Sequence, residues 1–375
     1  MRDFALEVYF SKWEFAARHH LTASDAETLP LTELVGLADD EDRRRWETLR
    51  LGYTPTWGSP WLRETIASTY EAVGPEEVLC FAGAQEGLYA AMRALLTRDD
   101  HAIVVVPNYQ SAETIPIDLC AVSGVPLDPQ RGWTLDIGAV ESALRPNTKL
   151  ISINFPNNPT GKILERDRFD ALVELCRRRG LWLFSDEVYR LIERDPKRRL
   201  PQAADLYERG LSLNVMSKAY GLPGLRLGWI ACRDGALLRR MERIKHYLSI
   251  CNAAPAEVLA RIALKARDRI LGRNRELAAH NLGLLGAFFG EHRDRFDWYL
   301  PDGSVVGYPR YRGPEGVEAF ATRLVETSGV LLLPASIYRS ELLPGPPDRF
   351  RIGYGRAGMA EGLAAFREFL VSGPA

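Results

Sequence analysis

Two short apolar runs near the middle of the chain each end beside a charged residue. Residues 181–184 lead to Asp186, and residues 211–216 lead to Lys218, which follows Asp186 by 32 positions. That spacing fits one helical connection and a second strand, so both side chains would lie at the same edge of a parallel sheet, where open α/β folds bind ligands. A carboxylate at the end of a buried strand is costly unless it is paired, which indicates a functional use for Asp186.

Other segments extend this pattern in both directions. Residues 78–81, 102–106 and 150–155 are short apolar runs, and the β-branched run at 102–106 is typical of a buried parallel strand. Amphipathic helical stripes alternate with these runs; one begins after the turn at 83–87 and another is ended by Gly180. The pattern predicts an α/β fold with a mostly parallel central sheet and helices on both faces.

The last part of the chain has a different character. Residues 256–292 are strongly helical, and the segments 302–309 and 330–334 are expected strands on either side of another amphipathic helix. We therefore expect a long connecting helix that leads into a smaller α+β domain. The predicted divisions are an arm, or part of the small domain, at 1–45, a large cofactor-binding domain at 46–265 and a small C-terminal domain at 266–375.

Lys218 and Arg226 together indicate a cofactor. Partial burial at a strand end lowers the pKa of an amine, and a neutral amine can form a Schiff base with an aldehyde. Arg226 lies eight positions later in a Gly/Pro-rich turn, and its permanent, forked charge suits a phosphate. The pair predicts an aldehyde cofactor that carries a phosphate, namely pyridoxal 5'-phosphate (PLP). For the lysine taken alone, a surface position near a turn is the alternative.

The stretch VMSKAYGLPGLRLGW at 215–229 resembles the active-site lysine motif of fold-type I PLP enzymes, in the class I/II aminotransferase family. Further motifs follow the family's order from Tyr53 to Arg351. The resemblance implies the fold-type I PLP-dependent transferase architecture, PLP as the cofactor, and small-molecule amino-acid and 2-oxo-acid substrates.

The resemblance also implies roles around the cofactor ring. Asp186, in an Asp-x-x-Tyr motif, would keep the pyridine nitrogen protonated, so that the ring can act as an electron sink. Tyr189 and Asn158, the latter in an Asn-Pro-x-Gly motif, would bond the phenolic oxygen. Tyr109 would stack on the ring from the end of the 102–106 strand. Lys218 would hold the cofactor and, once released, move the α-proton.

Further residues would bind the phosphate and the substrate. The expected phosphate ligands are Gly83, Ala84 and Gln85 at a helix N-terminus, Ser217, Arg226, and Tyr53 from the neighbouring subunit of a homodimer. Arg351 would fork onto the substrate α-carboxylate, with Asn158 beside it and Arg349 as the near alternative. Two positions depart from the family pattern: Val215 replaces a hydroxyl residue that contacts phosphate in many relatives, and Ala335 replaces a glycine.

The first 35 residues read as an arm. One helical face is expected to contain Val8, Phe10, Trp13, Phe15 and Ala16. Ser24 or Asp25 could cap a following turn. We interpret the arm chiefly as packing and capping residues. The alternative is that it closes over the substrate, as in related enzymes; Glu14, Asp25 or Glu27 could then pair with a substrate guanidinium.

Composition limits the partners. The net charge of −1 at pH 7 gives no bulk field that would favour nucleic acid or an acidic membrane surface. The five cysteines are far apart and include no CxxC pair, so neither a disulfide framework nor a metal site is expected. We find no signal-peptide pattern and no apolar run near the roughly 20 residues that a membrane helix needs, and we expect a cytoplasmic protein. The absence of a G-x-G-x-x-G motif after a strand disfavours a nicotinamide enzyme.

These observations favour a PLP-dependent aminotransferase that passes the amino group of an amino acid to a 2-oxo acid through a Schiff base on Lys218. The lysine stretch and the Trp13-Glu14 pair also resemble capreomycidine-synthase-like enzymes and PLP-dependent arginine oxidases. That alternative predicts an oxidase, dehydratase or cyclase acting on an arginine-type amino acid. A third possibility, a non-catalytic effector-binding module, is disfavoured because the segment before the first motif shows no helix-turn-helix pattern and no basic face.

Overall fold

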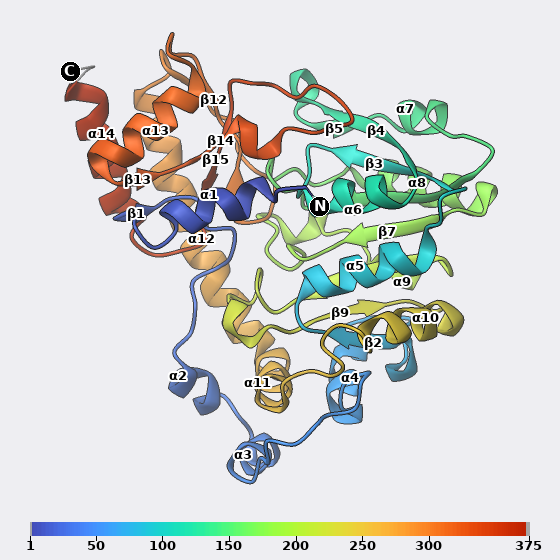
Figure 1. The fold of residues 1–375 in the computed structure, drawn as a ribbon. Coiled ribbons are helices and arrows are strands. Elements are labelled where there is room, and N and C mark those ends of the chain that lie inside the picture. Colours follow the sequence, from blue (N-terminus) through green and yellow to red (C-terminus); the bar gives the residue numbers. More distant parts are fainter. Residues whose placement is uncertain (1, 373–375) are drawn as a thin grey trace.

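The largest sheet organises the molecule. The structure, a computed structural model, describes residues 2–372, and within them this sheet has eight strands in the order β2-β9-β8-β7-β6-β3-β4-β5 (Figure 1). The strands are β2 (Val78–Phe81), β3 (His101–Val106), β4 (Ala121–Asp128), β5 (Thr134–Leu135), β6 (Thr148–Asn154), β7 (Trp182–Asp186), β8 (Gly210–Val215) and β9 (Gly228–Ala231).

Most neighbouring strands are parallel. β4, β3, β6, β7 and β8 pair in parallel, whereas β9 runs antiparallel to both β2 and β8, and β5 runs antiparallel to β4. The register places Asn154 beside Asp186 and Asp186 beside Leu213. The residues that follow β6, β7 and β8 therefore meet at one edge of the sheet. This confirms the expected α/β fold with a mostly parallel sheet.

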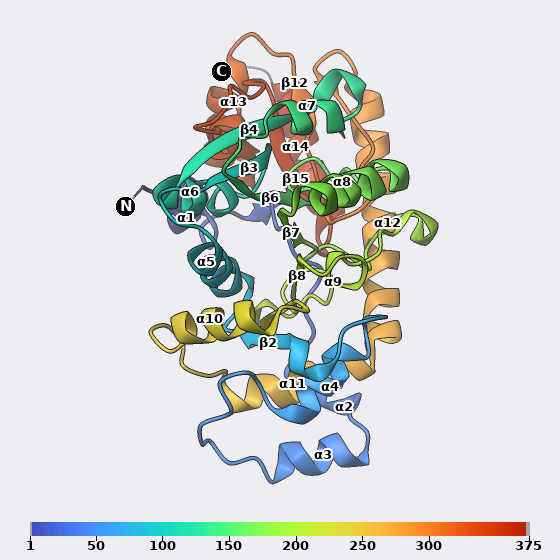
Figure 2. The ribbon, with the colours of Figure 1, turned by 90° about the vertical axis from the view of Figure 1, so that its right-hand side faces the viewer.

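Helices cover both faces of this sheet. Figure 2 shows α5 (Ala84–Leu95), α6 (Ser111–Leu119) and α10 (Gly235–Lys245) on one face, and α7 (Ile137–Ser142), α8 (Arg166–Arg179) and α9 (Ala203–Leu206) on the other. Side chains alternate between two buried cores, as expected of strands covered on both sides. In β7, for example, Trp182 and Phe184 belong to one core and Leu183 to the other.

The remaining helices lie beyond one end of the sheet and around the C-terminal part. They are α1 (Ala5–Trp13), α2 (Leu31–Gly36), α3 (Asp40–Glu47), α4 (Pro60–Ala67), α11 (Ala254–Lys265), α12 (Arg267–Glu291), α13 (Gly316–Ser328) and α14 (Met359–Ser372). Short 3-10 turns are η1 (Pro75–Glu77), η2 (Pro129–Arg131), η3 (Pro196–Arg198), η4 (Pro223–Leu225) and η5 (Ala335–Tyr338). The long α12 connects the two parts of the chain, as the helical pattern at 256–292 predicted (Figure 2). Within residues 2–372, no helix carries an apolar stretch that could cross a membrane.

Small sheets complete the C-terminal part. β11 (Val306–Gly307), β15 (Phe350–Gly353) and β14 (Leu333–Pro334) form one sheet, and β10 (Phe296–Asp297) pairs with β12 (Arg310–Tyr311). The N-terminal arm joins this region because β1 (His19–His20) pairs in parallel with β13 (Val330–Leu331). Figure 1 shows α1 lying between the C-terminal helices and the large sheet. The division of the chain at residues 45 and 265 stays a prediction.

Three local expectations were wrong. Phe15 lies after the end of α1 and is 96% exposed, so the arm helix is shorter than the apolar pattern suggested. The expected strand at 302–309 contains only the two-residue β11, and the segment at 330–334 divides between two sheets. Ser24 and Asp25 cap no helix, because the next helix begins at Leu31 after Pro30. Both instead face the cavity described below.

Candidate active site

A cavity of about 600 Å³ lies at the edge where β6, β7 and β8 end. Most residues singled out from the sequence line it: Glu14, Ala84, Gln85, Tyr109, Asn158, Asp186, Tyr189, Ser217, Lys218 and Arg226. Of the other three, Gly83 and Arg351 contact residues that line it, and Tyr53 lies elsewhere on the surface. The cavity is large enough for a cofactor with a small substrate, because ligand pockets generally span about 300–1,000 Å³.

Lys218 follows β8 and presents its amine to the cavity. Burial lowers the pKa of this amine to about 8, although Asp25 and Asp186 act in the opposite direction. A large fraction of the amine is therefore neutral at mildly alkaline pH, which is the form that attacks an aldehyde. The Nζ atom donates a hydrogen bond to the Ser24 hydroxyl at 2.8 Å. A serine of the N-terminal arm thus touches the amine from 194 positions away in the sequence.

Asp186 ends β7 and is 8% exposed. One carboxylate oxygen accepts a bond from the Val188 backbone N–H at 3.2 Å. Burial raises the pKa of this carboxyl to about 6, and the Val188 bond and Lys218 only partly offset that effect. Within residues 2–372, no cationic side chain forms an ion pair with Asp186, so the carboxylate is suited to a positively charged N–H group of a ligand.

Two further polar groups surround the same space. The Tyr189 hydroxyl donates to the Ser24 carbonyl oxygen at 2.9 Å, and burial raises the pKa of this phenol. The Asn158 side-chain oxygen accepts bonds from the Tyr338 hydroxyl at 3.1 Å and from Arg351 at 3.3 Å. This leaves the Asn158 amide nitrogen as a donor toward the cavity. Tyr109 packs against Phe4 of the arm, with ring centroids 5.2 Å apart.

The other end of the cavity is suited to an anion. Gly83 precedes α5 with φ +92°, and a Cβ built on it would lie 2.6 Å from Nη2 of Arg226. Arg226 thus lies against the first turn of α5, where free backbone N–H groups and the helix dipole already attract negative charge. Within residues 2–372 its guanidinium forms no ion pair with a protein carboxylate. Val215 lines the same cavity without a hydroxyl to offer, as the sequence indicated.

Arg351 lies in β15 and is fully buried. It donates to the Tyr338 hydroxyl at 2.6 Å, to Asn158 and to the Thr22 carbonyl oxygen at 2.7 Å. Its Nε has no hydrogen-bond partner in the described part of the chain. The guanidinium does not itself line the cavity, but it contacts Asn158, which does. Arg349 is directed elsewhere, because it donates to the Tyr308 carbonyl and stacks on the Trp133 ring.

The arm supplies most of the acidic groups. Asp25 is held by Arg356 in a two-pronged ion pair, with 3.0 and 2.7 Å between the paired atoms. Glu27 accepts from the Ala357 backbone N–H and does not line the cavity. Glu14 and Glu7 line it without an ion pair in the described residues, and burial raises the pKa of Glu14. Of the three carboxylates proposed for a guanidinium, Glu14 is thus the one that remains available.

Tyr53 does not line this cavity and is 92% exposed. Its loop is tied to the segment after α10, because the Thr54 hydroxyl donates to the Asn252 carbonyl oxygen at 2.9 Å. Leu51 in the same loop and Tyr247 after α10 are also highly exposed. Within a single chain, Tyr53 is thus not among the residues that line the site.

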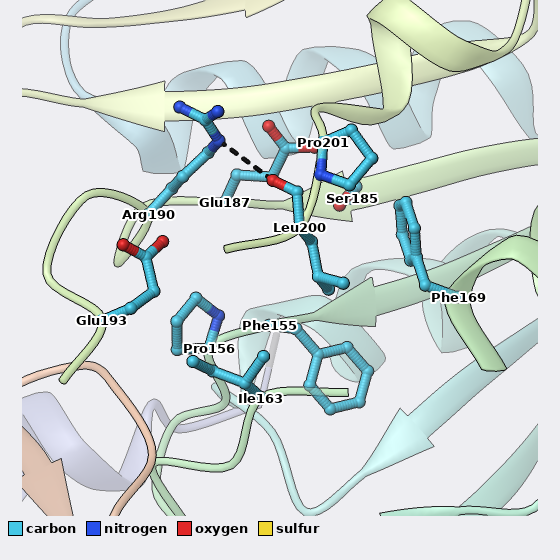
Figure 3. A pocket seen from close by; sticks show the side chains of 10 residues that line it. All are labelled: Phe155, Pro156, Ile163, Phe169, Ser185, Glu187, Arg190, Glu193, Leu200 and Pro201. Atoms are coloured by element: carbon cyan, nitrogen blue, oxygen red, sulfur yellow. Dashed lines mark hydrogen bonds between the residues drawn. The ribbon is translucent and has the colours of Figure 1, made fainter. Parts of the chain in front are cut away.

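A separate hole of about 10 Å³ is lined by residues at the end of β7, in α8 and in the segments that follow β6 and β7 (Figure 3). Its lining includes Glu187, Arg190 and Glu193, and Arg190 donates to the Leu200 carbonyl at 3.3 Å. This volume fits about one water molecule. Glu187 is bonded to the Ala203 N–H and the Ser212 hydroxyl, both at 2.9 Å, so it stabilises the loop after β7 and does not face the larger cavity.

The groups around the large cavity fit PLP by their chemistry. A lysine amine, a buried carboxylate, neutral donors and an unpaired arginine beside a helix N-terminus match an aldehyde, a pyridine nitrogen, a phenolic oxygen and a phosphate.

Sequence reasoning missed several residues of this region. Tyr338 lies next to Arg351, and Ser24 touches Lys218. His20 lines the cavity with both ring nitrogens unpartnered in the described residues, and burial lowers the pKa of its ring. The adjacent His-His pair was the only sequence signal for His20, and its two-residue strand is too short to show a period of two.

Several known proteins resemble this chain over most of its length. Capreomycidine synthase from Streptomyces vinaceus is 28% identical over 97% of this chain and 93% of its own length. An arginine–pyruvate transaminase from Pseudomonas aeruginosa is 29% identical over 84% of this chain and 80% of its own length. A crystal structure of a PLP-dependent aminotransferase from Streptococcus suis superposes with a TM-score of 0.91 at 27% identity, over 100% of this chain and 99% of that one. The family model for aminotransferase class I and II matches residues 24–366, and the chain belongs to this family of PLP-dependent enzymes.

Proposed function

We propose that the protein is an aminotransferase that moves the amino group of an amino acid to a 2-oxo acid, with Lys218 as the residue that holds PLP. The observation that carries this proposal is that the Lys218 amine and the Asp186 carboxylate, from the ends of adjacent parallel strands, face one cavity of about 600 Å³. The family membership supports the same reaction class.

Different residues of the chain would hold the ring and the phosphate of PLP. Asp186 would accept the pyridine N–H, and Asn158 would donate to the phenolic oxygen. Tyr189 would also donate to that oxygen, after giving up its present bond to the Ser24 carbonyl oxygen. Tyr109 would cover the ring face. The phosphate would be held by Arg226, by Ser217 and by the N-terminal turn of α5 at Gly83, Ala84 and Gln85. When bound, PLP supplies an electron-withdrawing ring that takes up the electron pair left on the substrate α-carbon.

Lys218 and Arg351 would act on the substrate. Released from the cofactor, the neutral Lys218 amine would take the α-proton onto Nζ and then pass it on to a different carbon atom. The lowered pKa of the amine makes its neutral form accessible near neutral pH. Arg351 would bind the α-carboxylate after exchanging one of its present acceptors, Thr22 or Tyr338. The Arg351 Nε that now lacks a partner is a further donor for a carboxylate.

The test follows the amino group itself. The PLP-loaded protein is incubated with ¹⁵N-labelled amino acids and unlabelled 2-oxo acids, and the new amino acid is analysed by mass spectrometry. Transfer of the label to the acceptor carbon skeleton is expected. Release of the label as ammonia, or consumption of the donor without any acceptor, would contradict aminotransfer.

A second candidate function is an oxidase, dehydratase or cyclase reaction on an arginine-type amino acid. Glu7 and Glu14 support it, because both are free carboxylates at the arm side of the cavity and would pair with a guanidinium. The similarity to capreomycidine synthase points in the same direction. Glu14→Gln should then raise KM for arginine about tenfold, the effect of one charged hydrogen bond, and leave KM for neutral amino acids nearly unchanged. Equal effects on both kinds of substrate would exclude Glu14 as a guanidinium partner.

We also propose that the protein is a homodimer in which Tyr53 reaches the neighbour's phosphate site. Three exposed side chains support it: Leu51 at 86%, Tyr53 at 92% and Tyr247 at 92%. Apolar and aromatic groups exposed together mark contact surfaces, and two-fold dimers are the commonest assembly.

A further inference from the structure

Ser24 lies in direct contact with the amine that the proposed reaction depends on. Its Oγ accepts a hydrogen bond from Nζ of Lys218 at 2.8 Å, and its carbonyl oxygen accepts one from the Tyr189 hydroxyl at 2.9 Å. Both Ser24 and Lys218 line the large cavity. One residue of the N-terminal arm therefore contacts two groups at the base of the site.

The backbone of the arm around Ser24 is held by hydrogen bonds and close packing against other segments of the chain. The Ala26 N–H donates to the Lys218 carbonyl at 3.1 Å, and the Glu27 N–H donates to the Gly355 carbonyl at 2.8 Å. A Cβ on Gly353 or Gly355 would collide with carbonyl oxygens of this segment.

Gly221 also packs closely against the backbone of this arm segment. A Cβ on Gly221, three residues after Lys218, would lie 2.5 Å from the Glu27 carbonyl oxygen. Glycines from the lysine turn and from the end of β15 thus leave just enough space for the backbone of residues 23–27. Asp25 is further fixed by its two-pronged pair with Arg356. The backbone of Ser24 is consequently held by its neighbours on both sides, which keeps the serine side chain within reach of Lys218.

We propose that Ser24 is a further catalytic residue, whose hydroxyl holds the free Lys218 amine and orients it for transfer of the substrate α-proton. This proposal rests on the proposed use of Lys218 as the proton-transferring group. As the substrate C–H bond breaks, its electron pair stays with the substrate–cofactor system, and the proton forms a new N–H bond on Nζ. The Ser24 oxygen accepts one N–H of the amine throughout, and it does so more strongly once the nitrogen is charged.

Two substitutions of Ser24 test the role of its hydroxyl group. Ser24→Ala removes the acceptor, and Ser24→Thr keeps it. Thr28→Ala is the matched control, because it deletes a hydroxyl that is exposed in the same arm. We expect Ser24→Ala to lower kcat about tenfold, the effect of one hydrogen bond to a charged group, with little change in KM. The isotope effect on kcat with α-deuterated amino acid should rise, because proton transfer becomes more rate-limiting. Ser24→Thr should restore both values.

A readout without turnover tests the same contact. In the full-length protein freed of PLP, the rate of amine acetylation at Lys218 is followed by peptide mass spectrometry as the pH is varied. The wild-type midpoint should lie near the pKa of about 8, and Ser24→Ala should lower it because the ammonium loses an acceptor. Should Ser24→Ala not fold, Ser24→Cys, a weak acceptor of similar size, is measured by the same criteria.

The outcomes separate the two proposals. An unchanged labelling midpoint and an unchanged isotope effect in Ser24→Ala would overturn the role of Ser24. A raised KM that Ser24→Thr fails to rescue would equally assign Ser24 to arm structure alone. Failure of the wild type to transfer the ¹⁵N label would overturn aminotransfer, whereas the labelling midpoint of Lys218 would still decide the role of Ser24.

Discussion

Gly83→Ala should separate cofactor binding from folding. Gly83 has φ +92° and ψ 168°, a region that is essentially limited to glycine. An added Cβ would lie 2.6 Å from Nη2 of Arg226 and 3.2 Å from its Cζ. Because these atoms are the far end of a flexible side chain, the guanidinium can move away and the protein can still fold. The movement would take the charge out of the proposed phosphate position.

The two effects have different sizes. Backbone strain of this kind costs about 1–3 kcal/mol of the free energy of unfolding. Loss of a charge-assisted bond between Arg226 and the phosphate would cost about 1.5–3 kcal/mol of binding, which corresponds to a roughly 10- to 150-fold higher Kd for PLP.

Gly316→Ala is the matched control for strain. Gly316 also has a positive φ of +79°, but a Cβ there would meet nothing within 4 Å. Both variants should lose stability in urea unfolding, and only Gly83→Ala should lose PLP affinity in an absorbance titration of the cofactor-free protein. An unchanged Kd in a Gly83→Ala protein that shows the expected loss of stability would refute the assignment of this end of the cavity to phosphate.

Three further outcomes test the rest of the site. The pKa of Asp186 is raised from 3.8 to about 6, so the folded cofactor-free protein binds this proton more tightly than the unfolded chain does. The free energy of unfolding should therefore fall by about 2 kcal/mol as the pH rises from 4 to 6, and Asp186→Asn should remove that dependence in urea unfolding at each pH. Tyr53→Phe should speed loss of PLP during dialysis, whereas Tyr89→Phe, another exposed tyrosine, should not; equal retention by both would argue against the cross-subunit role. Arg351→Lys should raise KM for the amino acid about tenfold, because lysine cannot form the two parallel bonds, and an unchanged KM in steady-state kinetics would place the carboxylate elsewhere.

Local pattern was sufficient for the large sheet and for the residues that follow its strands. Asp186 is the last residue of β7, and Asn158 and Lys218 follow shortly after β6 and β8, so the positions of the strands along the chain were enough to place all three at one sheet edge. The glycine turn before α5 could also be predicted from the sequence, because a helix N-terminus depends on residues that are close in sequence.

Contacts made by the arm could not be predicted from local sequence patterns. Ser24 meets Lys218 only because a two-residue strand, His19–His20, pairs with Val330–Leu331 and because glycines far along the chain leave room for the arm backbone. Neither feature produces a periodic signal in the sequence near Ser24. The same holds for Tyr338 at the end of η5, because its partner Arg351 lies in β15, 13 residues later.

The most direct test of the account is the position of the cofactor-bearing amine. The PLP-loaded protein is reduced with borohydride, digested, and analysed by peptide mass spectrometry. The pyridoxyl group is expected on Lys218, at the edge of the cavity shared with Asp186. The two buried lysines Lys162 and Lys245 serve as internal controls, because both are engaged in other hydrogen bonds. Attachment to either of them, or to no lysine in a protein that has bound PLP, would contradict the central claim.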